Sequence, residues 1–138
     1  MSQENVELVR RLFKAVEERD LAGVLAAYDP KIVIREAESL PYGGVYDGLA
    51  GAKLHAGKYA LTWGPFQTSA EQVTDAVFLD AGDHVVVLWR QKGLSAHSGQ
   101  RLDLPAVSVY KLHSGKIVES QMYQADTSAI LRFLESKK

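Results

Sequence analysis

"ENVELVRRLFKAVEERDLAGVLAAYDPKIVIRE", residues 4–36, holds two helical patterns and a strand pattern in one run. The apolar residues of its first half recur three or four positions apart: Val6, Val9, Phe13 and Val16. This spacing predicts an amphipathic helix with its charged residues on the opposite face. Asp20 is well placed to cap a second, short helix over residues 21–28, which Pro30 ends because the residue before a proline avoids the helical conformation.

The strand pattern at residues 31–37 contains a carboxylate where the alternation calls for an apolar residue. Ile32, Ile34 and Glu36 fall on one face of this strand, because successive side chains point to opposite sides. Two interpretations follow for Glu36. It is either an edge carboxylate paired with a Lys or Arg, or a functional carboxylate whose pKa burial raises toward neutral.

The next segment, "SLPYGGVYDG" at residues 39–48, is dense in turn-forming residues. Its glycines are spaced as in a phosphate-binding loop, but that motif requires a Lys and then Ser or Thr, and Leu49 and Ala50 follow instead. The segment is therefore interpreted as a turn that leads into a third helix, over residues 49–63.

The second half of the chain alternates as in a sheet. The expected strands cover residues 66–79, 84–95, 100–113 and 116–124. A tight hairpin turn is predicted at "HSGK", and a final helix at residues 126–136 begins at Asp126, a residue type preferred at the N-cap. This order predicts an α+β fold in one domain, residues 1–138, with the helices on one face of a curved antiparallel sheet.

One expected strand is apolar on both faces. In "HVVVLWRQ", residues 84–91, Val85, Val87 and Trp89 share one face while Val86 and Leu88 share the other. A strand that is apolar on both sides is usually covered on both sides. Since the helices cover one face, we expect a second copy of the chain to cover the other, giving a homodimer through the outer face of the sheet.

Composition excludes several classes of function. The 138 residues include 16 basic and 17 acidic side chains, a net charge of −1 that does not favour nucleic acid or an anionic membrane. There is no cysteine, hence no disulfide or thiol nucleophile. Without a signal-peptide pattern or an apolar run of about 18 residues, a cytoplasmic protein is expected. The histidines lack metal-ligand spacing, so neither a metal nor a cofactor is expected: His55, His84, His97 and His113.

Polar side chains among apolar ones on the later strands predict a cavity for a small molecule, since such sites combine apolar walls with a few polar groups. Besides Glu36, the residues expected to line it are Trp63, Val87, Trp89, Gln91, Asp103, Val107, Glu119, Gln121 and Tyr123. Tyr28 and Tyr59 are interpreted as packing residues between helix and sheet.

The chain resembles the nuclear transport factor 2-like superfamily, and within it the SnoaL-like domains. The segments that carry the resemblance are "VRRLFKAVEERDLAGVLAAYDPKIVI" (9–34), "GGVYDGLAG" (43–51) and "VYKLHSGKIVESQMYQADTSAILRFL" (109–134). The resemblance implies a cone-shaped half-barrel, often dimeric, with a pocket between the helices and the concave face of the sheet. Ketosteroid isomerases, polyketide cyclases, dehydratases and non-catalytic binding domains share this fold, so the fold alone does not select the chemistry.

The resemblance also implies roles for single residues. Glu36 matches the position of the catalytic base of the ketosteroid isomerases, whereas their two oxyanion donors are matched by Leu12 and Val107, which donate no hydrogen bond. The cyclase branch uses a carboxylate near the last strand, where Glu119 and Asp126 stand.

The resulting hypothesis is a cofactor-independent isomerase, cyclase or dehydratase that acts on a hydrophobic carbonyl compound. Glu36 would move the proton, and Tyr123 with Gln121 or Asp103 would hydrogen-bond the substrate. Trp63, Val87, Trp89 and Val107 would form the apolar wall beside Gln91 and Glu119. The alternative is a non-catalytic ligand-binding or dimerisation domain of the same fold.

Overall fold

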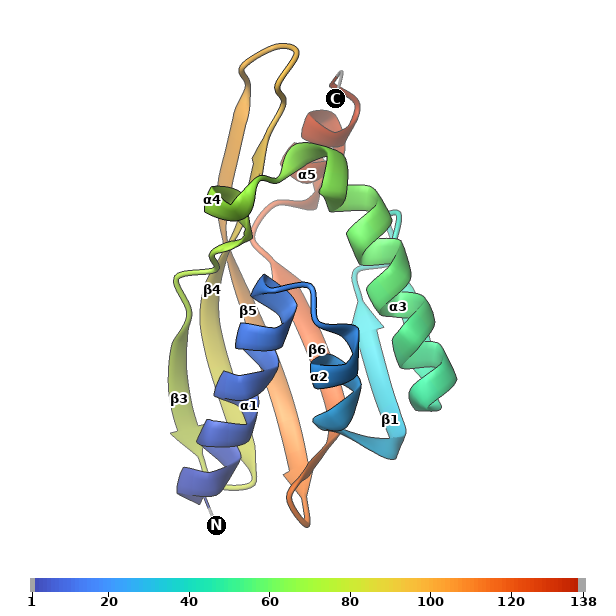
Figure 1. Ribbon diagram of the computed structural model, residues 1–138, viewed down its shortest axis with the longest axis vertical. Helices are drawn as coiled ribbons and strands as arrows, with labels where there is room; N and C mark the ends of the chain where they lie inside the picture. Colours follow the sequence, from blue (N-terminus) through green and yellow to red (C-terminus); the bar gives the residue numbers. More distant parts are fainter. Residues whose placement is uncertain (1, 137–138) are drawn as a thin grey trace.

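The computed structural model describes residues 2–136, and its strands form one curved, unclosed sheet in the order β2-β1-β6-β5-β4-β3 (Figure 1). The strands are β1 (Tyr28–Glu36), β2 (Gly44–Asp47), β3 (Val77–Ala81), β4 (His84–Leu94), β5 (Arg101–His113) and β6 (Lys116–Gln124). The helices are α1 (Ser2–Glu17), α2 (Leu21–Ala26), α3 (Gly48–Trp63), the 3-10 turn η1 (Gly64–Phe66), α4 (Ser69–Gln72) and α5 (Thr127–Leu134). Neighbouring strands are antiparallel except β1 and β6, which run parallel. The α+β fold expected from the sequence is confirmed.

Side-chain caps fix where two of the helices begin. Asp20 accepts a hydrogen bond from the Gly23 backbone N–H at 3.0 Å, and Asp126 accepts one from Ala129 at 3.0 Å, so both predicted caps are confirmed. The helix after Asp20 is shorter than expected, because β1 already begins at Tyr28. No helix within residues 2–136 is long and apolar enough to cross a membrane.

The core lies between the helices and the concave face of the sheet. Phe13 of α1 is its centre, with its ring edge-on to Phe78, Trp89 and Tyr110 at centroid distances of 5.5, 6.1 and 6.1 Å. A second apolar cluster covers the other end of the sheet: Leu40, Tyr42, Trp63, Phe66, Leu102, Ile130 and Phe133. Burial of each large apolar side chain contributes about 1.5–3 kcal/mol, so the two clusters hold α1, α3 and α5 on the sheet.

The prediction of a strand at residues 66–79 is wrong over most of that range. Thr68 and Glu71 form a capping box, in which the Glu71 carboxylate accepts the Thr68 backbone N–H at 2.6 Å, and this starts the short helix α4. Only residues 77–81 pair as β3. The turn-rich segment at 39–48 also contains a strand, since Gly44–Asp47 pairs with β1 as β2.

A bulge in β6 determines which of its side chains face the core. Leu112 pairs with Ile117, but Lys111 pairs with Glu119, so Val118 is an extra residue on β6. An extra residue reverses the alternation beyond it. Glu119 therefore points to the outer, convex face of the sheet, although it has the same parity as the buried Ile117.

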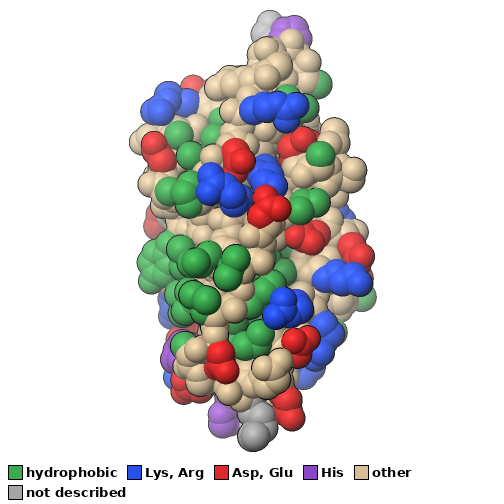
Figure 2. Space-filling model, turned by 90° about the vertical axis from the view of Figure 1, so that its left-hand side faces the viewer, with side chains coloured by type: hydrophobic (Ala, Val, Ile, Leu, Met, Phe, Trp, Pro, Cys, Tyr) green, Lys and Arg blue, Asp and Glu red, His purple; other side chains and the backbone are tan. Residues whose placement is uncertain are grey.

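The outer face of the sheet carries two apolar rows that cross the strands. Paired positions give one row of Val77, Leu88, Val107 and Tyr123, and a second of Leu79, Val86 and Val109. Val77, Leu79, Leu88 and Tyr123 are all exposed, at 52%, 43%, 43% and 56%. Figure 2 shows hydrophobic side chains gathered on the side of the molecule that carries β3, beside a band of charged side chains.

Candidate active site

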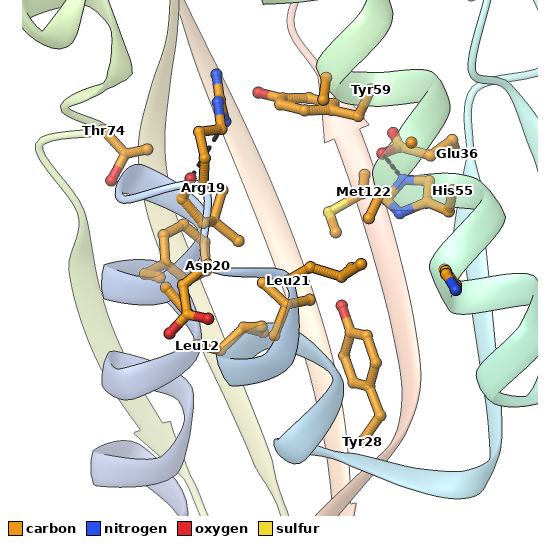
Figure 3. Close-up of a pocket in the computed structure, with 18 of the residues that line it drawn as sticks. Leu12, Arg19, Asp20, Leu21, Tyr28, Glu36, His55, Tyr59, Thr74 and Met122 are labelled. Carbon is orange, nitrogen blue, oxygen red and sulfur yellow. Dashed lines mark hydrogen bonds and ion pairs between the residues drawn. The ribbon is translucent and has the colours of Figure 1, made fainter.

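A cavity of about 350 Å³ lies between α1, α2, α3 and the concave face of the sheet (Figure 3). Its walls are mostly apolar and include Leu12, Phe13, Val16, Leu21, Val24, Trp89 and Met122. The polar side chains that line it are Arg19, Asp20, Tyr28, Glu36, Lys53, His55, Tyr59, Thr74 and Tyr110. An apolar cavity of this size with a few polar groups suits a small hydrophobic molecule.

Glu36 and His55 form a buried pair in the wall of this cavity. Glu36 is the last residue of β1, on the same inward face as Ile32 and Ile34, so the predicted alternation of this strand is confirmed. Its Oε2 atom lies 2.8 Å from Nε2 of His55 on α3, and the two residues are only 7% and 8% exposed. The other carboxylate oxygen, Oε1, is buried and has no hydrogen-bond partner among the described residues.

The surroundings of Glu36 change its acidity. Burial raises the pKa of the Glu36 carboxyl above its ordinary value, while the hydrogen bond and the charge of His55 lower the pKa in part. The net direction is upward. A carboxyl group with a raised pKa, held by one oxygen and free at the other, is suited to accept and return a proton.

Two tyrosines supply hydroxyl groups to the cavity. The hydroxyl of Tyr28 points into it (Figure 3) and makes no hydrogen bond within residues 2–136, so it is available to a ligand. Burial and the nearby Glu36 raise the pKa of Tyr28, which keeps the hydroxyl protonated as a donor. The Tyr59 hydroxyl donates to Oε1 of Gln91 at 3.1 Å, and burial raises the pKa of Tyr59 to about 12.

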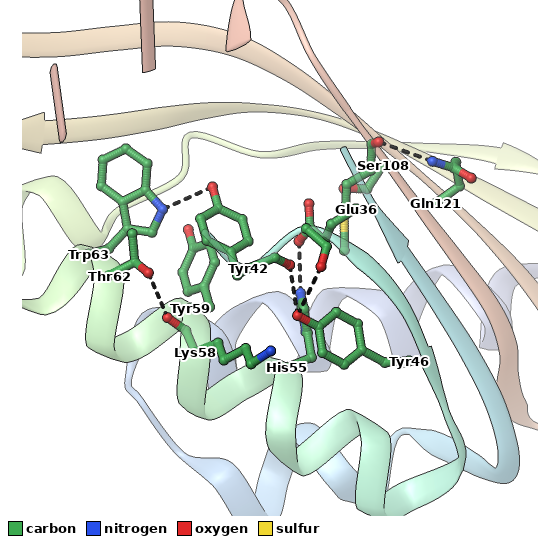
Figure 4. A network of polar contacts seen from close by, with 12 residues as sticks. Glu36, Tyr42, Tyr46, His55, Lys58, Tyr59, Thr62, Trp63, Ser108 and Gln121 are labelled. Carbon is green, nitrogen blue, oxygen red and sulfur yellow. Dashed lines mark hydrogen bonds and ion pairs between the residues drawn. The ribbon is translucent and has the colours of Figure 1, made fainter. Parts of the chain in front are cut away.

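A turn and a strand behind the cavity hold His55 in position (Figure 4). The ring of Tyr46 on β2 meets the His55 ring edge-on at 5.1 Å. The Tyr46 hydroxyl donates to the backbone oxygens of Tyr42 and Gly43, at 3.0 and 3.3 Å. The Tyr42 hydroxyl in turn accepts the indole N–H of Trp63 at 3.0 Å. The pair therefore stands on a hydrogen-bonded support rather than on a loose loop.

The site residues predicted from the sequence fall into two groups, one on the inner side of the sheet or in its core and one on the outer face. Glu36 and Trp89 line the cavity. Val87 and Gln91 share the inward face of β4 with Trp89 but are buried behind the lining, and Trp63 lies in the second apolar cluster. Gln91 still affects the site, because it holds the Tyr59 hydroxyl.

The other predicted residues lie on the outer face of the sheet, outside the lining of the cavity: Asp103, Val107, Glu119, Gln121 and Tyr123. Asp103 pairs with Arg90 at 2.6 Å, and Glu119 lies between Arg35 and Lys111 at 3.6 and 3.9 Å. Tyr123 is 56% exposed. The hydroxyl groups that line the cavity belong instead to other tyrosines, among them Tyr28 and Tyr59.

His55 is the main residue that the sequence analysis missed as a site residue. The spacing of the histidines bears only on metal binding, yet His55 lies on the same helical stripe as Ala52, Ala56 and Tyr59, which faces the sheet. A histidine on a buried stripe opposite an inward glutamate is the signal that would have found the pair. No three His, Asp or Glu side chains within residues 2–136 gather closely enough to hold a metal ion.

The sequence and fold match known proteins. The model of the family described as "SnoaL-like domain" matches residues 9–120. The fold is similar to that of TerC co-crystallised with polyporic acid (TM-score 0.81, 23% identity, 96% of this chain and 99% of that one). It is also similar to an NTF2-like protein of unknown function from Burkholderia pseudomallei (TM-score 0.81, 23% identity, 96% of this chain and 98% of that one). A third similar structure is a putative SnoaL-like polyketide cyclase from Jannaschia sp. (TM-score 0.73, 21% identity, 99% of this chain and 95% of that one). No curated protein matches the sequence.

Proposed function

Because the chain belongs to the SnoaL-like domain family, we propose that it is a cofactor-independent enzyme of isomerase or lyase type. Its substrate is a hydrophobic carbonyl compound that fills the cavity. The observation that carries this proposal is the buried Glu36, which pairs with His55 through one oxygen and leaves the other without a partner in an apolar wall. Among similar folds, the complex with polyporic acid and the putative polyketide cyclase support a small organic compound as ligand.

The proposed reaction moves one proton. Oε1 of Glu36 takes a proton from the carbon next to the carbonyl group, and the electrons of that C–H bond form the C=C bond of an enolate. The negative charge passes to the carbonyl oxygen, which the Tyr28 hydroxyl stabilises by a hydrogen bond. His55, with a proton on Nε2, holds Oε2 of Glu36 in place. Glu36 then returns the proton to the same carbon or to a conjugated one.

Deuterium exchange tests this proposal without knowledge of the natural substrate. We expect the protein to exchange the hydrogens next to the carbonyl of 2-tetralone, a small hydrophobic ketone, faster than buffer alone, as followed by NMR in D₂O. Since the base must be ionised, the rate should rise with pH through the pKa of Glu36, above the ordinary value of 4.5. Exchange at the buffer rate across this pH range would contradict the proposal.

Replacing His55 by leucine should move the rise of this pH profile to higher pH. The hydrogen bond and the charge of His55 both lower the pKa of Glu36, so their loss leaves burial to raise it further. The matched control is His84→Leu, which removes a histidine paired with Asp83 at 2.8 Å at the start of β4, far along the chain from Glu36. A rise at the same pH in the His55 variant would show that His55 does not tune the base.

We also propose a homodimer through the outer face of the sheet. The two apolar rows on that face cross β3, β4, β5 and β6, and four of their residues are exposed: Val77, Leu79, Leu88 and Tyr123. Exposed apolar surface of this kind, flanked by charged side chains, is typical of a contact between proteins. A second copy is the occupant that we expect, since the row from Val77 to Tyr123 presents apolar side chains that a copy of itself matches.

Leu88→Lys should convert this dimer to a monomer. Leu88 is the second residue of that row, and a lysine there would bury a charge at the interface. We expect light scattering at micromolar concentration to give a mass near twice 15.2 kDa for the wild type and 15.2 kDa for the variant. Leu61→Lys is the control, because Leu61 is 80% exposed on α3, away from the sheet. A monomeric wild type would exclude the dimer.

A further inference from the structure

Arg19 has a backbone conformation that favours glycine. It lies between α1 and α2 with a φ of 58°, in the left-handed region, which costs a residue with a side chain about 1–3 kcal/mol. A glycine would end α1 at this point at less cost. An arginine in this conformation requires that its side-chain contacts offset the cost.

The side chain of Arg19 lines the cavity beside Tyr59. Its guanidinium donates to the Val16 carbonyl at 3.1 Å and to Oε1 of Gln67, whose own amide donates to the Lys92 carbonyl at 2.9 Å. The guanidinium carbon lies 5.7 Å from the centre of the Tyr59 ring. These contacts fix the cation at the lining, and they leave N–H groups of the guanidinium free to bind a ligand.

The positive charge of Arg19 has no counter-charge in the described part of the chain, where no carboxylate forms an ion pair with it. Of the three acidic side chains nearest along the chain, Glu18 is exposed and forms no ion pair with Arg19, and the other two are engaged elsewhere. Asp20 caps α2, and Glu17 accepts hydrogen bonds from the backbone and side chain of Thr74 at 2.8 and 2.6 Å. Glu36 lies on the other side of the cavity and is paired with His55 (Figure 3).

We propose that Arg19 binds an anionic group of the substrate, which makes the substrate a hydrophobic organic acid. Its apolar body lies against the walls, its carboxylate pairs with Arg19 beside Tyr59, and its carbonyl group lies toward Glu36. The inference deepens the proposed function and rests on it for the role of Glu36. The binding of the anion by itself requires no reaction. A guanidinium binds a carboxylate through two parallel hydrogen bonds, and a low-polarity cavity strengthens the pairing.

A pair of probes of equal shape tests this binding. We expect the wild type to bind 2-naphthoate at least about tenfold more tightly than 2-naphthamide, as measured by isothermal titration calorimetry, because only the first carries a charge for Arg19. Arg19→Gln should abolish this preference, chiefly by weakening the binding of the naphthoate. Arg19→Gly should do the same with a backbone that suits φ of 58°.

Two further variants separate this inference from its alternatives. Lys53→Gln removes another cation that lines the cavity, and it should keep the preference. Glu36→Gln should also keep it, so a failure of the proposed catalysis leaves the test of Arg19 intact. A preference that survives in both Arg19 variants would reduce Arg19 to a structural link between α1 and η1. A wild type that binds both probes equally, or neither, would overturn the inference as well.

Discussion

Replacing Glu36 by glutamine is expected to lower the catalysed exchange of 2-tetralone hydrogens at least about 100-fold, since a positioned general base contributes about 10²–10⁴ in rate. Glutamine has the same shape and still accepts the hydrogen bond from His55, but its amide cannot take a proton from carbon. Binding of the ketone should remain within about threefold of the wild type, because the apolar walls are unchanged. NMR exchange rates and calorimetric affinities, measured on the same preparation, separate the two effects.

Glu36→Gln should also change the stability of the fold in a predictable direction. A carboxyl group whose pKa is raised in the folded state destabilises the fold when it is ionised, and this effect begins as pH rises above the ordinary value of 4.5. Glu36→Gln removes that cost, so thermal unfolding at neutral pH should occur at the same temperature as in the wild type or a higher one. A loss of activity together with a retained fold then points to chemistry.

Glu119→Gln is the matched control for Glu36→Gln. It makes the same chemical change on the outer face of the sheet, where Glu119 forms half-exposed ion pairs with Arg35 and Lys111. Such pairs contribute little, about 0–1 kcal/mol, and exchange should be unaffected. If Glu36→Gln left the exchange rate as high as in this control, Glu36 would not be the base. The alternative of a non-catalytic ligand-binding or dimerisation domain would then be favoured.

Local patterns in the sequence predicted the part of the site that lies on β1. Strict alternation from Ile32 to Glu36 requires only that the strand be regular, and it is regular over these residues. The caps at Asp20 and Asp126 also depend on neighbouring residues alone. These features were predictable because no distant part of the chain decides them.

Alternation alone does not show which side chains of the later strands face the core. On β6, the extra residue at Val118 reverses the pattern after Ile117, and nothing in the sequence marks it. On β5, the inward face carries the small Ala106 and the polar Ser108, while Val107 faces outward. When the outer face is itself apolar, hydrophobicity no longer tells the two faces apart.

The pairing of Glu36 with His55 joins residues 19 positions apart, one on a strand and one on a helix. Glu36 by itself had an ordinary explanation, as an edge carboxylate, and the spacing of His55 from the other histidines gave no sign of a site. Only the packing of α3 against β1 shows that the two side chains meet. The same packing brings Tyr28 and Tyr59, which the sequence indicated as packing residues, into the wall of the cavity.

Gly43→Ala is expected to destabilise the fold by at least about 3 kcal/mol, at the upper end of the range for overpacking. A Cβ atom at Gly43 would lie 2.2 Å from the backbone oxygen of Ala37 and 2.7 Å from that of Glu38. These are backbone atoms of a turn that hydrogen bonds already fix, from Leu40 to Ala37 at 3.1 Å and from Gly43 to Leu40 at 2.8 Å. The turn has no flexible side chain to move aside, so the whole segment must shift.

Gly57→Ala provides the contrast, because a Cβ atom at Gly57 meets nothing within 4 Å on α3. Alanine is about 0.8–1 kcal/mol more favourable than glycine inside a helix, so this variant should be slightly more stable than the wild type. Thermal unfolding should place the two variants on opposite sides of the wild type, with Gly43→Ala lower by about 10 °C. Equal melting temperatures would mean that the turn is loose.

The effect of Gly43→Ala should extend to the site. Gly43 and Tyr42 carry the backbone oxygens that hold the Tyr46 hydroxyl, and the Tyr46 ring packs against His55. A shifted turn would therefore loosen His55 and weaken its hold on Glu36. We expect exchange of 2-tetralone to fall further than the unfolded fraction alone explains, as measured well below the melting temperature. The glycine-rich segment then acts on the chemistry by positioning His55, without contacting the substrate.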